Sequence, residues 1–277
     1  MKKLLLPILA IILLAIVVAP KNAYSKEVQH HKKVYAWDSY DWLILSLEGK
    51  KKVAESGNAF AQCYMGKLYL GEIKTYNVSV DYPEAEKWFL ESARQGYTEG
   101  QVMLATMYFK GIGVKKNYTK SLMWLSKASE LGSVEANLYL GYLYWHEGTG
   151  FQNPKTACAY FRKAAKHGNL WGLFELGNAY LIGKGVPQNY RQAKVLFSMA
   201  AEQEHPSSQF GLAVLYYKGL GVQKDNIKAC MWANLAASQG HKAAAQALKE
   251  ISASLPPAQV AIAQQLAHSW LKKKRKR

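Results

Sequence analysis

The residues of this chain whose types could support chemistry are its histidines, its three cysteines and the glycines and lysines of its recurrent turns. A protein metal site needs nitrogen, sulfur or carboxylate ligands at short spacings such as His-x-x-x-His or Cys-x-x-Cys. Neither spacing occurs in the sequence, and no serine stands in a nucleophile-elbow motif. We therefore predict no catalytic residue, no metal site and no cofactor, and expect that the protein is not an enzyme.

One turn, Gly183-Lys184-Gly185, has the superficial form of a phosphate-binding loop, in which backbone amides and a lysine hold phosphate. Similar turns recur at residues 110–114 and 218–222. We interpret them as links between helices, because glycines give a tight turn the backbone freedom that it needs.

A period of 36 residues organises most of the sequence. Each unit reads as two amphipathic helices joined by a glycine-rich turn, and the first helix carries a leucine, a small residue and then a tyrosine one turn later. We place these tyrosines in the hairpin interior. They are Tyr108, Tyr144, Tyr180 and Tyr216. Because one hairpin cannot bury its own apolar face, we predict an all-α fold, an α/α solenoid of stacked hairpins.

The second helices repeat as well. A large side chain three residues after a small one is predicted to fill the core. These side chains are Trp88, Trp124, Tyr160, Leu196 and Trp232. A glycine then ends the helix in four of the five units, whereas Glu204 takes this position in the fourth, so that His205-Pro206 suggests a different terminator there.

The repeated residues resemble the Sel-1-like repeat family, a relative of the tetratricopeptide repeats. The resemblance rests on Leu176-Gly177 with Tyr180, on Gly219-Leu-Gly-Val222, on Lys228-Ala229 with Trp232, and on Ala236-Ala237 with Gly240. It covers five units, at residues 58–96, 97–132, 133–168, 169–204 and 205–240. The resemblance implies a protein-interaction scaffold, and relatives are associated with envelope assembly, signalling and contact with host cells.

Segments outside the repeats have distinct predicted roles. Residues 1–25 resemble a bacterial signal peptide, with an apolar run at 4–18 that is the core of a cleaved signal or an uncleaved membrane anchor. Residues 26–57 hold an N-terminal segment and a capping helix, residues 241–271 hold capping helices, and residues 272–277 form a basic tail. We therefore expect an exported protein, periplasmic or secreted.

Three helices are expected in these flanks. The first, over residues 41–57, buries Trp42 and Leu45. The second spans residues 242–254, and the third, over residues 258–272, buries a single stripe. The stripe consists of Val260, Ala263, Leu266, Ala267 and Trp270.

Charge and cysteine content limit the partners. The net charge is +17, and the tail formed by residues 272–277 could contact anionic lipid, glycan or nucleic acid, act as a nuclear import signal in a host cell, or be a solvated frayed end. No motif supports sequence-specific nucleic-acid binding. Cys63, Cys158 and Cys230 are expected to be buried free thiols, because Cys158 and Cys230 lie two repeats apart. A penicillin-binding or β-lactamase activity attributed to cysteine-rich relatives thus lacks its cysteine pattern here.

The candidate partner site comes from positions that are equivalent in register but differ in chemistry. They form one stripe along the first helices, which in such arrays line a concave groove. The candidate groove residues are Met103, Thr106, Lys110, Tyr139, Tyr142, His146, Trp171, Glu175, Asn178, Val214 and Lys218. Tyr139, Tyr142 and Trp171 would give the groove an aromatic centre. The alternative is that Tyr139 or Trp171 packs between repeats.

Two functions follow from this pattern. The favoured hypothesis is a non-enzymatic adaptor of the envelope or secreted fraction that holds a protein or peptide in the groove, with host interaction as one setting. The alternative is a cell-wall enzyme or regulator that acts on peptidoglycan or binds β-lactams. The sequence leaves the oligomeric state open.

Overall fold

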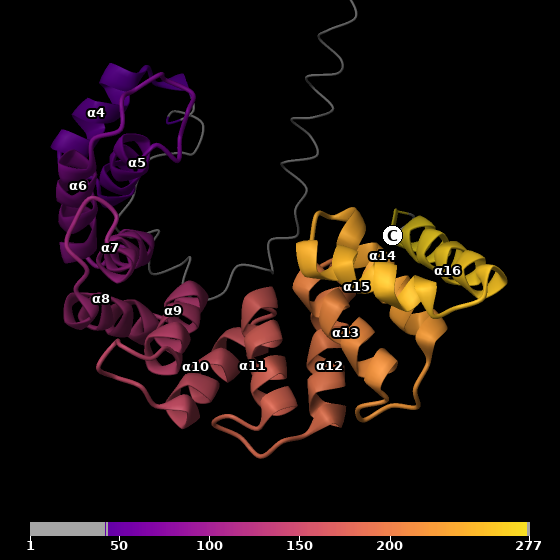
Figure 1. Cartoon of the computed structure of the whole chain (residues 1–277). Coiled ribbons are helices and arrows are strands. Elements are labelled where there is room, and N and C mark those ends of the chain that lie inside the picture. Colours follow the sequence, from indigo (N-terminus) through magenta and orange to yellow (C-terminus); the bar gives the residue numbers. More distant parts are fainter. Residues whose placement is uncertain (1–41, 43, 276–277) are drawn as a thin grey trace, which may run out of the picture.

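The structure is a computed structural model that describes residue 42 and residues 44–275, and these residues form helices joined by turns, without a strand (Figure 1). The signal or anchor predicted for residues 1–25 lies outside the described residues. Thirteen helices have bounds in the described part of the chain. They are α4 (Leu47–Glu55), α5 (Ala59–Leu70), α6 (Tyr82–Arg94), α7 (Thr98–Lys110), α8 (Tyr118–Glu130), α9 (Val134–Trp145), α10 (Pro154–Lys166), α11 (Leu170–Ile182), α12 (Tyr190–Ala201), α13 (Pro206–Lys218), α14 (Asn226–Ser238), α15 (Lys242–Ala253) and α16 (Pro257–Arg275).

Consecutive helices pack as hairpins, and the hairpins stack along an arc (Figure 1). The pairs are α5/α6, α7/α8, α9/α10, α11/α12 and α13/α14. First helices also contact the next first helix along the array, as α5 does α7 and α7 does α9. Figure 1 shows α5, α7 and α9 on the inner side of the arc and α6, α8 and α10 outside them. The predicted all-α solenoid is confirmed.

Each second helix begins with the same polar cap. The cap residue's side-chain oxygen accepts a hydrogen bond from a backbone N–H three residues later, at 2.8–3.1 Å. Its own N–H donates to the carbonyl of the tyrosine near the end of the preceding helix, at 2.7–3.0 Å. The cap residues are Asp81, Asn117, Asn153, Asn189 and Asp225. This pair of bonds fixes the geometry of every hairpin turn.

In three of the five hairpins a glycine of the first helix faces a phenylalanine of the second. A Cβ on Gly141 would lie 2.3 Å from Cε1 of Phe161, and Gly177 stands in the same relation to Phe197 at 2.6 Å. Phe161 and Phe197 are fully buried. Of the predicted core side chains, Trp88 and Trp124 are buried, whereas Tyr160, Leu196 and Trp232 are only half-buried. In the third and fourth repeats the fully buried ring stands one residue later than predicted. The first-helix tyrosines are also less enclosed than expected, since only Tyr108 is fully buried and the other three are half-buried.

The reason for the tyrosines' position is visible at Tyr108. Its hydroxyl donates a hydrogen bond to Oε1 of Glu86 at 2.5 Å, and Nζ of Lys120 lies 4.8 Å from the centre of its ring. Burial and this carboxylate raise the pKa of Tyr108 to about 12. The ring therefore packs in the hairpin while its hydroxyl stays at the polar edge.

The fourth repeat keeps the usual helix end despite its glutamate. Glu204 has φ +62°, which is the left-handed conformation that Gly96, Gly132, Gly168 and Gly240 adopt at the equivalent positions. The expectation of a different terminator was wrong, because the stack imposes this conformation on a residue that does not favour it.

The flanking helices differ from their predicted bounds. Ser46 caps α4, so the helix expected over residues 41–57 is interrupted, although Trp42 is buried and Leu45 packs with it. At the other end α16 continues to Arg275, and the first four residues of the predicted basic tail are therefore helical.

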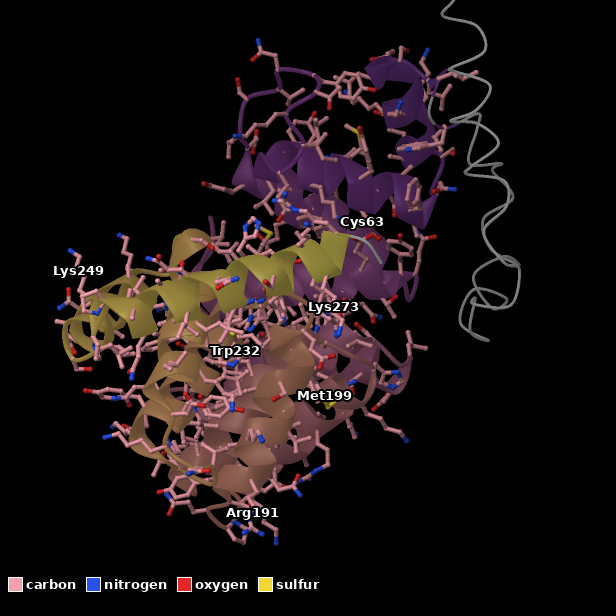
Figure 2. The ribbon with its side chains drawn as sticks, turned by 90° about the vertical axis from the view of Figure 1, so that its right-hand side faces the viewer. Cys63, Arg191, Met199, Trp232, Lys249 and Lys273 are labelled. Atoms are coloured by element: carbon pink, nitrogen blue, oxygen red, sulfur yellow. The ribbon has the colours of Figure 1, made fainter. Side chains whose placement is uncertain are left out.

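Helix α16 packs on α14 through two small residues, Ala263 and Ala267, and through Trp270, whose ring centre lies 5.7 Å from that of Trp232. Figure 2 shows Trp232 beside α16. Leu266 was expected in this buried stripe but is 41% exposed, so the contact through Ala263 and Ala267 does not cover the full width of the stripe.

Candidate partner-binding site

The predicted stripe lies along α7, α9, α11 and α13, the first helices of four hairpins, of which Figure 1 shows α7 and α9 on the inner side of the arc. Lys110, His146, Trp171 and Lys218 are exposed. The other predicted residues are half-buried, and they are Met103, Thr106, Tyr139, Tyr142, Glu175, Asn178 and Val214. The Thr106 hydroxyl donates a hydrogen bond to the carbonyl of Val102 in its own helix, at 2.8 Å.

Helices α7 and α9 meet at Tyr139. Its ring centre lies 6.3 Å from that of Phe109, edge to face, and Nζ of Lys110 lies 6.0 Å from it. Tyr139 also contacts Tyr142 within α9, at 6.2 Å. Tyr139 therefore packs between repeats and borders the inner surface, which combines the two alternatives considered for it.

Helices α9 and α11 are joined through Tyr142. Its hydroxyl donates a hydrogen bond to Oε1 of Glu175 at 3.3 Å, its ring stacks on His146 at 5.9 Å, and its edge meets the buried Phe161 at 5.6 Å. Burial followed by the nearby carboxylate raises the pKa of Tyr142. Burial also raises the pKa of Glu175, against the hydrogen bonds from Tyr142 and Asn178, which lower it. Five predicted residues thus form one cluster across two repeats.

Trp171 begins the stripe on α11 and is 49% exposed. Its ring meets His205, the N-cap of α13, at 4.7 Å between centres and nearly perpendicular, and meets Phe174 at 6.1 Å. His205 is buried, with Nδ1 at 2.9 Å from the Ser208 hydroxyl. Trp171 therefore packs against the next repeat and against Phe174 of its own helix, and about half of its surface is exposed.

Some members of this surface were missed in the sequence. Phe109, Phe174 and His205 support the predicted aromatic residues and were not among the candidates. A useful signal for His205 would have been that the preceding units carry asparagine, tyrosine or serine at this helix cap, whereas histidine stands there in this unit and again at His241. Val214 and Lys218 share no hydrogen bond, ring contact or ion pair with the cluster formed by Tyr139, Tyr142, His146, Glu175 and Asn178.

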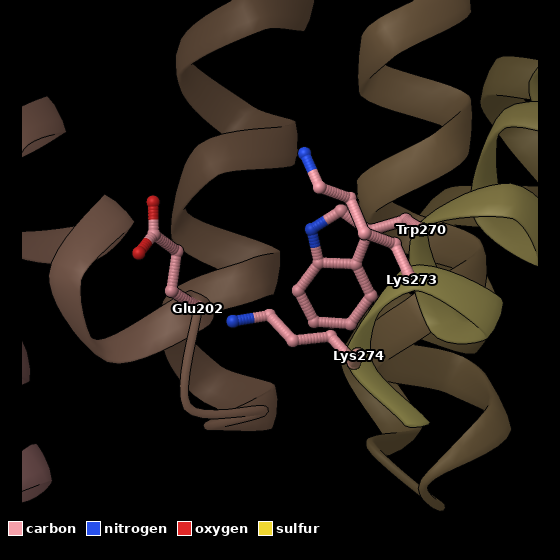
Figure 3. A pocket seen from close by; sticks show the side chains of 4 residues that line it. All are labelled: Glu202, Trp270, Lys273 and Lys274. Carbon is pink, nitrogen blue, oxygen red and sulfur yellow. The ribbon is translucent and has the colours of Figure 1, made fainter. Parts of the chain in front are cut away.

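Three hollows in the described surface lie away from this stripe. One of about 180 Å³ opens between Glu202 and α16 and is lined by Trp270, Lys273 and Lys274 (Figure 3). Another of about 380 Å³ lies at the last hairpin turn, beside Tyr216 and Lys228. A third of about 520 Å³ lies between α4 and α6, beside Trp88.

Within residue 42 and residues 44–275, no group of three or more histidine, cysteine, aspartate or glutamate side chains could hold a metal ion. The three cysteines are buried free thiols. A membrane crossing would need a longer and more apolar helix than any found in this part of the chain.

Helical hairpins stacked in an array, with surface side chains that differ from repeat to repeat, are characteristic of the α-solenoid scaffolds. Proteins of this class generally act through protein–protein contacts. The Sel1 repeat model matches residues 59–97, 98–133, 134–169, 172–205 and 206–241. The chain belongs to the Sel1 repeat family.

Two solved structures show what the chain is similar to. A protective antigen of uropathogenic Escherichia coli strains, which displays an SLR fold, is 32% identical with a TM-score of 0.73, over 81% of this chain and 48% of that one. A Sel1 repeat protein from Oxalobacter formigenes is 31% identical with a TM-score of 0.57, over 79% of this chain and 62% of that one. The chain thus spans about half to three fifths of these relatives. No curated protein matched the sequence.

Proposed function

We propose that this protein is a non-enzymatic adaptor that binds a protein or peptide partner along the inner stripe of its first helices, with Tyr142 and Trp171 as anchors. Large aromatic side chains with one face free and one edge fixed are typical of interface anchors, since little side-chain entropy is lost when they are covered. The fixed edges here are the contacts of Tyr142 with Phe161 and of Trp171 with His205.

The observation that carries the proposal is the half-exposed Trp171 next to the cluster formed by Tyr139, Tyr142, His146, Glu175 and Asn178. The cluster lies where α9 meets α11. Packing does not require these residue types, because the contact between α5 and α7 uses a different set, in which Glu99 pairs with Lys67.

The proposed place of action is the envelope or the secreted fraction of a bacterium, on the strength of the signal-like residues 1–25. The likeness to a protective antigen supports an exposed setting in which a host molecule could be the partner. The basic residues at the end of α16 would add a contact with an anionic surface.

The test uses two side chains of equal exposure on different helices. Trp171 on first helix α11 and Met199 on second helix α12 (Figure 2) are each 49% exposed. Trp171→Ala should weaken capture of partners from extracts of the expressing cells by about tenfold or more, the usual effect of losing an anchor. Met199→Ala should leave capture unchanged. Equal capture by wild type and Trp171→Ala, or loss with Met199→Ala alone, would show that the stripe is not the interface.

A further inference from the structure

Charge is distributed unevenly between the two layers of the solenoid. The chain has 36 lysines and arginines against 19 acidic residues, yet α9 and α11 contain no lysine or arginine and one glutamate each. The second helices that follow them, α10 and α12, have the opposite composition: they contain lysine and arginine but no acidic residue. Helices α9 and α11 therefore bring glutamate and aromatic residues, but no lysine or arginine, to their surface in a protein that is basic as a whole.

The carboxylate of Glu175 is the focus of this region. It is half-buried, and it accepts hydrogen bonds from the hydroxyl of Tyr142 and from the side chain of Asn178. Neither neighbour is cationic. None of the ion pairs formed within residue 42 and residues 44–275 includes Glu175. Burial raises the pKa of Glu175 by more than these two hydrogen bonds lower it.

A second glutamate on an inner helix shows the contrast. Glu99 on α7 is exposed, and even so it forms an ion pair with Lys67 of α5 and accepts a hydrogen bond from the hydroxyl of Tyr97 at 3.2 Å. Glu175 is more enclosed and has no such partner, although removing a carboxylate from water without a cation costs free energy.

We propose that Glu175, with Tyr142 beside it and Trp171 one helical turn before it, forms a subsite for a positively charged side chain of the bound partner, an arginine or a lysine. A guanidinium group can bond both oxygens of a carboxylate and lie against an aromatic face at once. The inference rests on the inner stripe being the partner interface. It assigns the partner a basic residue at this position, despite the positive charge of the protein as a whole.

The experiment uses a defined probe, because it does not require the natural partner. Two fluorescein-labelled peptides of alternating glycine and arginine, or glycine and citrulline, differ only in the charge of the side chain. Fluorescence anisotropy measures their binding to the full chain. The wild type should bind the arginine peptide about tenfold more tightly than the citrulline peptide. Glu175→Gln should remove this preference.

The matched control is Glu135→Gln, which removes the same charge from an exposed position on α9. It should keep the preference for arginine. A preference that persists in Glu175→Gln, that is lost equally in Glu135→Gln, or that is absent in the wild type would overturn the subsite. If Trp171→Ala abolishes partner capture while Glu175→Gln leaves the arginine preference intact, the interface stands and only the subsite fails.

Discussion

Replacing Gly141 by alanine should destabilise the array, because the added methyl group would collide with the ring of Phe161. The added Cβ would lie 2.3 and 2.4 Å from Cε1 and Cδ1 of Phe161, a ring that is fully buried and cannot move into solvent. Overpacking of this kind costs about 1–3 kcal/mol of unfolding free energy. For a chain of this size the midpoint of thermal unfolding should fall by about 2–4 °C for each kcal/mol.

Another repeat of the sequence combines a larger residue at the glycine position with a smaller residue at the phenylalanine position. In the preceding repeat the equivalent residues are Ala105 and Leu125, both buried in one core cluster. Phe161→Leu alone should leave a void and cost about 1–2 kcal/mol. In the double variant Gly141→Ala with Phe161→Leu, the methyl group fills that void. The double variant should thus lose less than the two single variants together, with a coupling of about 1–2 kcal/mol.

The assay is chemical and thermal unfolding of the four proteins, followed by far-ultraviolet circular dichroism. The reciprocal cycle is the control: Leu125→Phe should destabilise, and Ala105→Gly should relieve it. The reasoning is refuted if Gly141→Ala is as stable as the wild type, or if the losses in the double variant simply add. Either result would mean that the size of these two side chains is not matched within each hairpin.

Three further changes test other parts of the structure. Glu204→Gly should stabilise by about 0.5–1 kcal/mol, because φ is +62° there, and Glu204→Ala, which keeps the strain, should show no gain in denaturant unfolding. Burial, then His241, lowers the pKa of His205 from 6.5, so the unfolded chain binds the proton first and stability should fall as pH drops below about 6.5. His205→Asn places at this cap the residue type found at Asn169, and it should reduce the dependence of stability on pH in thermal melts taken above and below pH 6.5. An unchanged dependence would exclude His205 as its source. Burial raises the pKa of the Cys63, Cys158 and Cys230 thiols, so a thiol reagent should label them only at the rate of unfolding, and rapid labelling of the native protein would contradict their burial.

The fold could be predicted from the sequence because each repeat carries the same local sequence pattern. A leucine, a small residue and a capped turn recur in register, so an error in one unit is corrected by the others. The core side chain of the second helix was predicted only in part. Trp88 and Trp124 are buried as predicted, but Trp232 is half-buried, and the rings that pack against the glycines are Phe89, Phe161 and Phe197.

The candidate site was less accessible to sequence reasoning. A comparison of equivalent positions in the repeats identified Tyr142, Glu175 and Trp171 as candidates. It did not predict that Tyr142 of α9 forms a hydrogen bond with Glu175 of α11. That contact depends on the rotation of α11 relative to α9, which no single repeat specifies. The same limit explains Glu204, where the stack, and not the local residue preference, determines the backbone conformation.

The most direct test of the central claim is site-specific photocrosslinking in cells that express the chain. A photoreactive phenylalanine analogue replaces Trp171 in one variant and Met199 in the other, two positions that are each 49% exposed. The account predicts a partner adduct from position 171, lost when Tyr142 is also changed to alanine, and no adduct from position 199. Adducts from position 199 alone would contradict it and move the interface to the second helices.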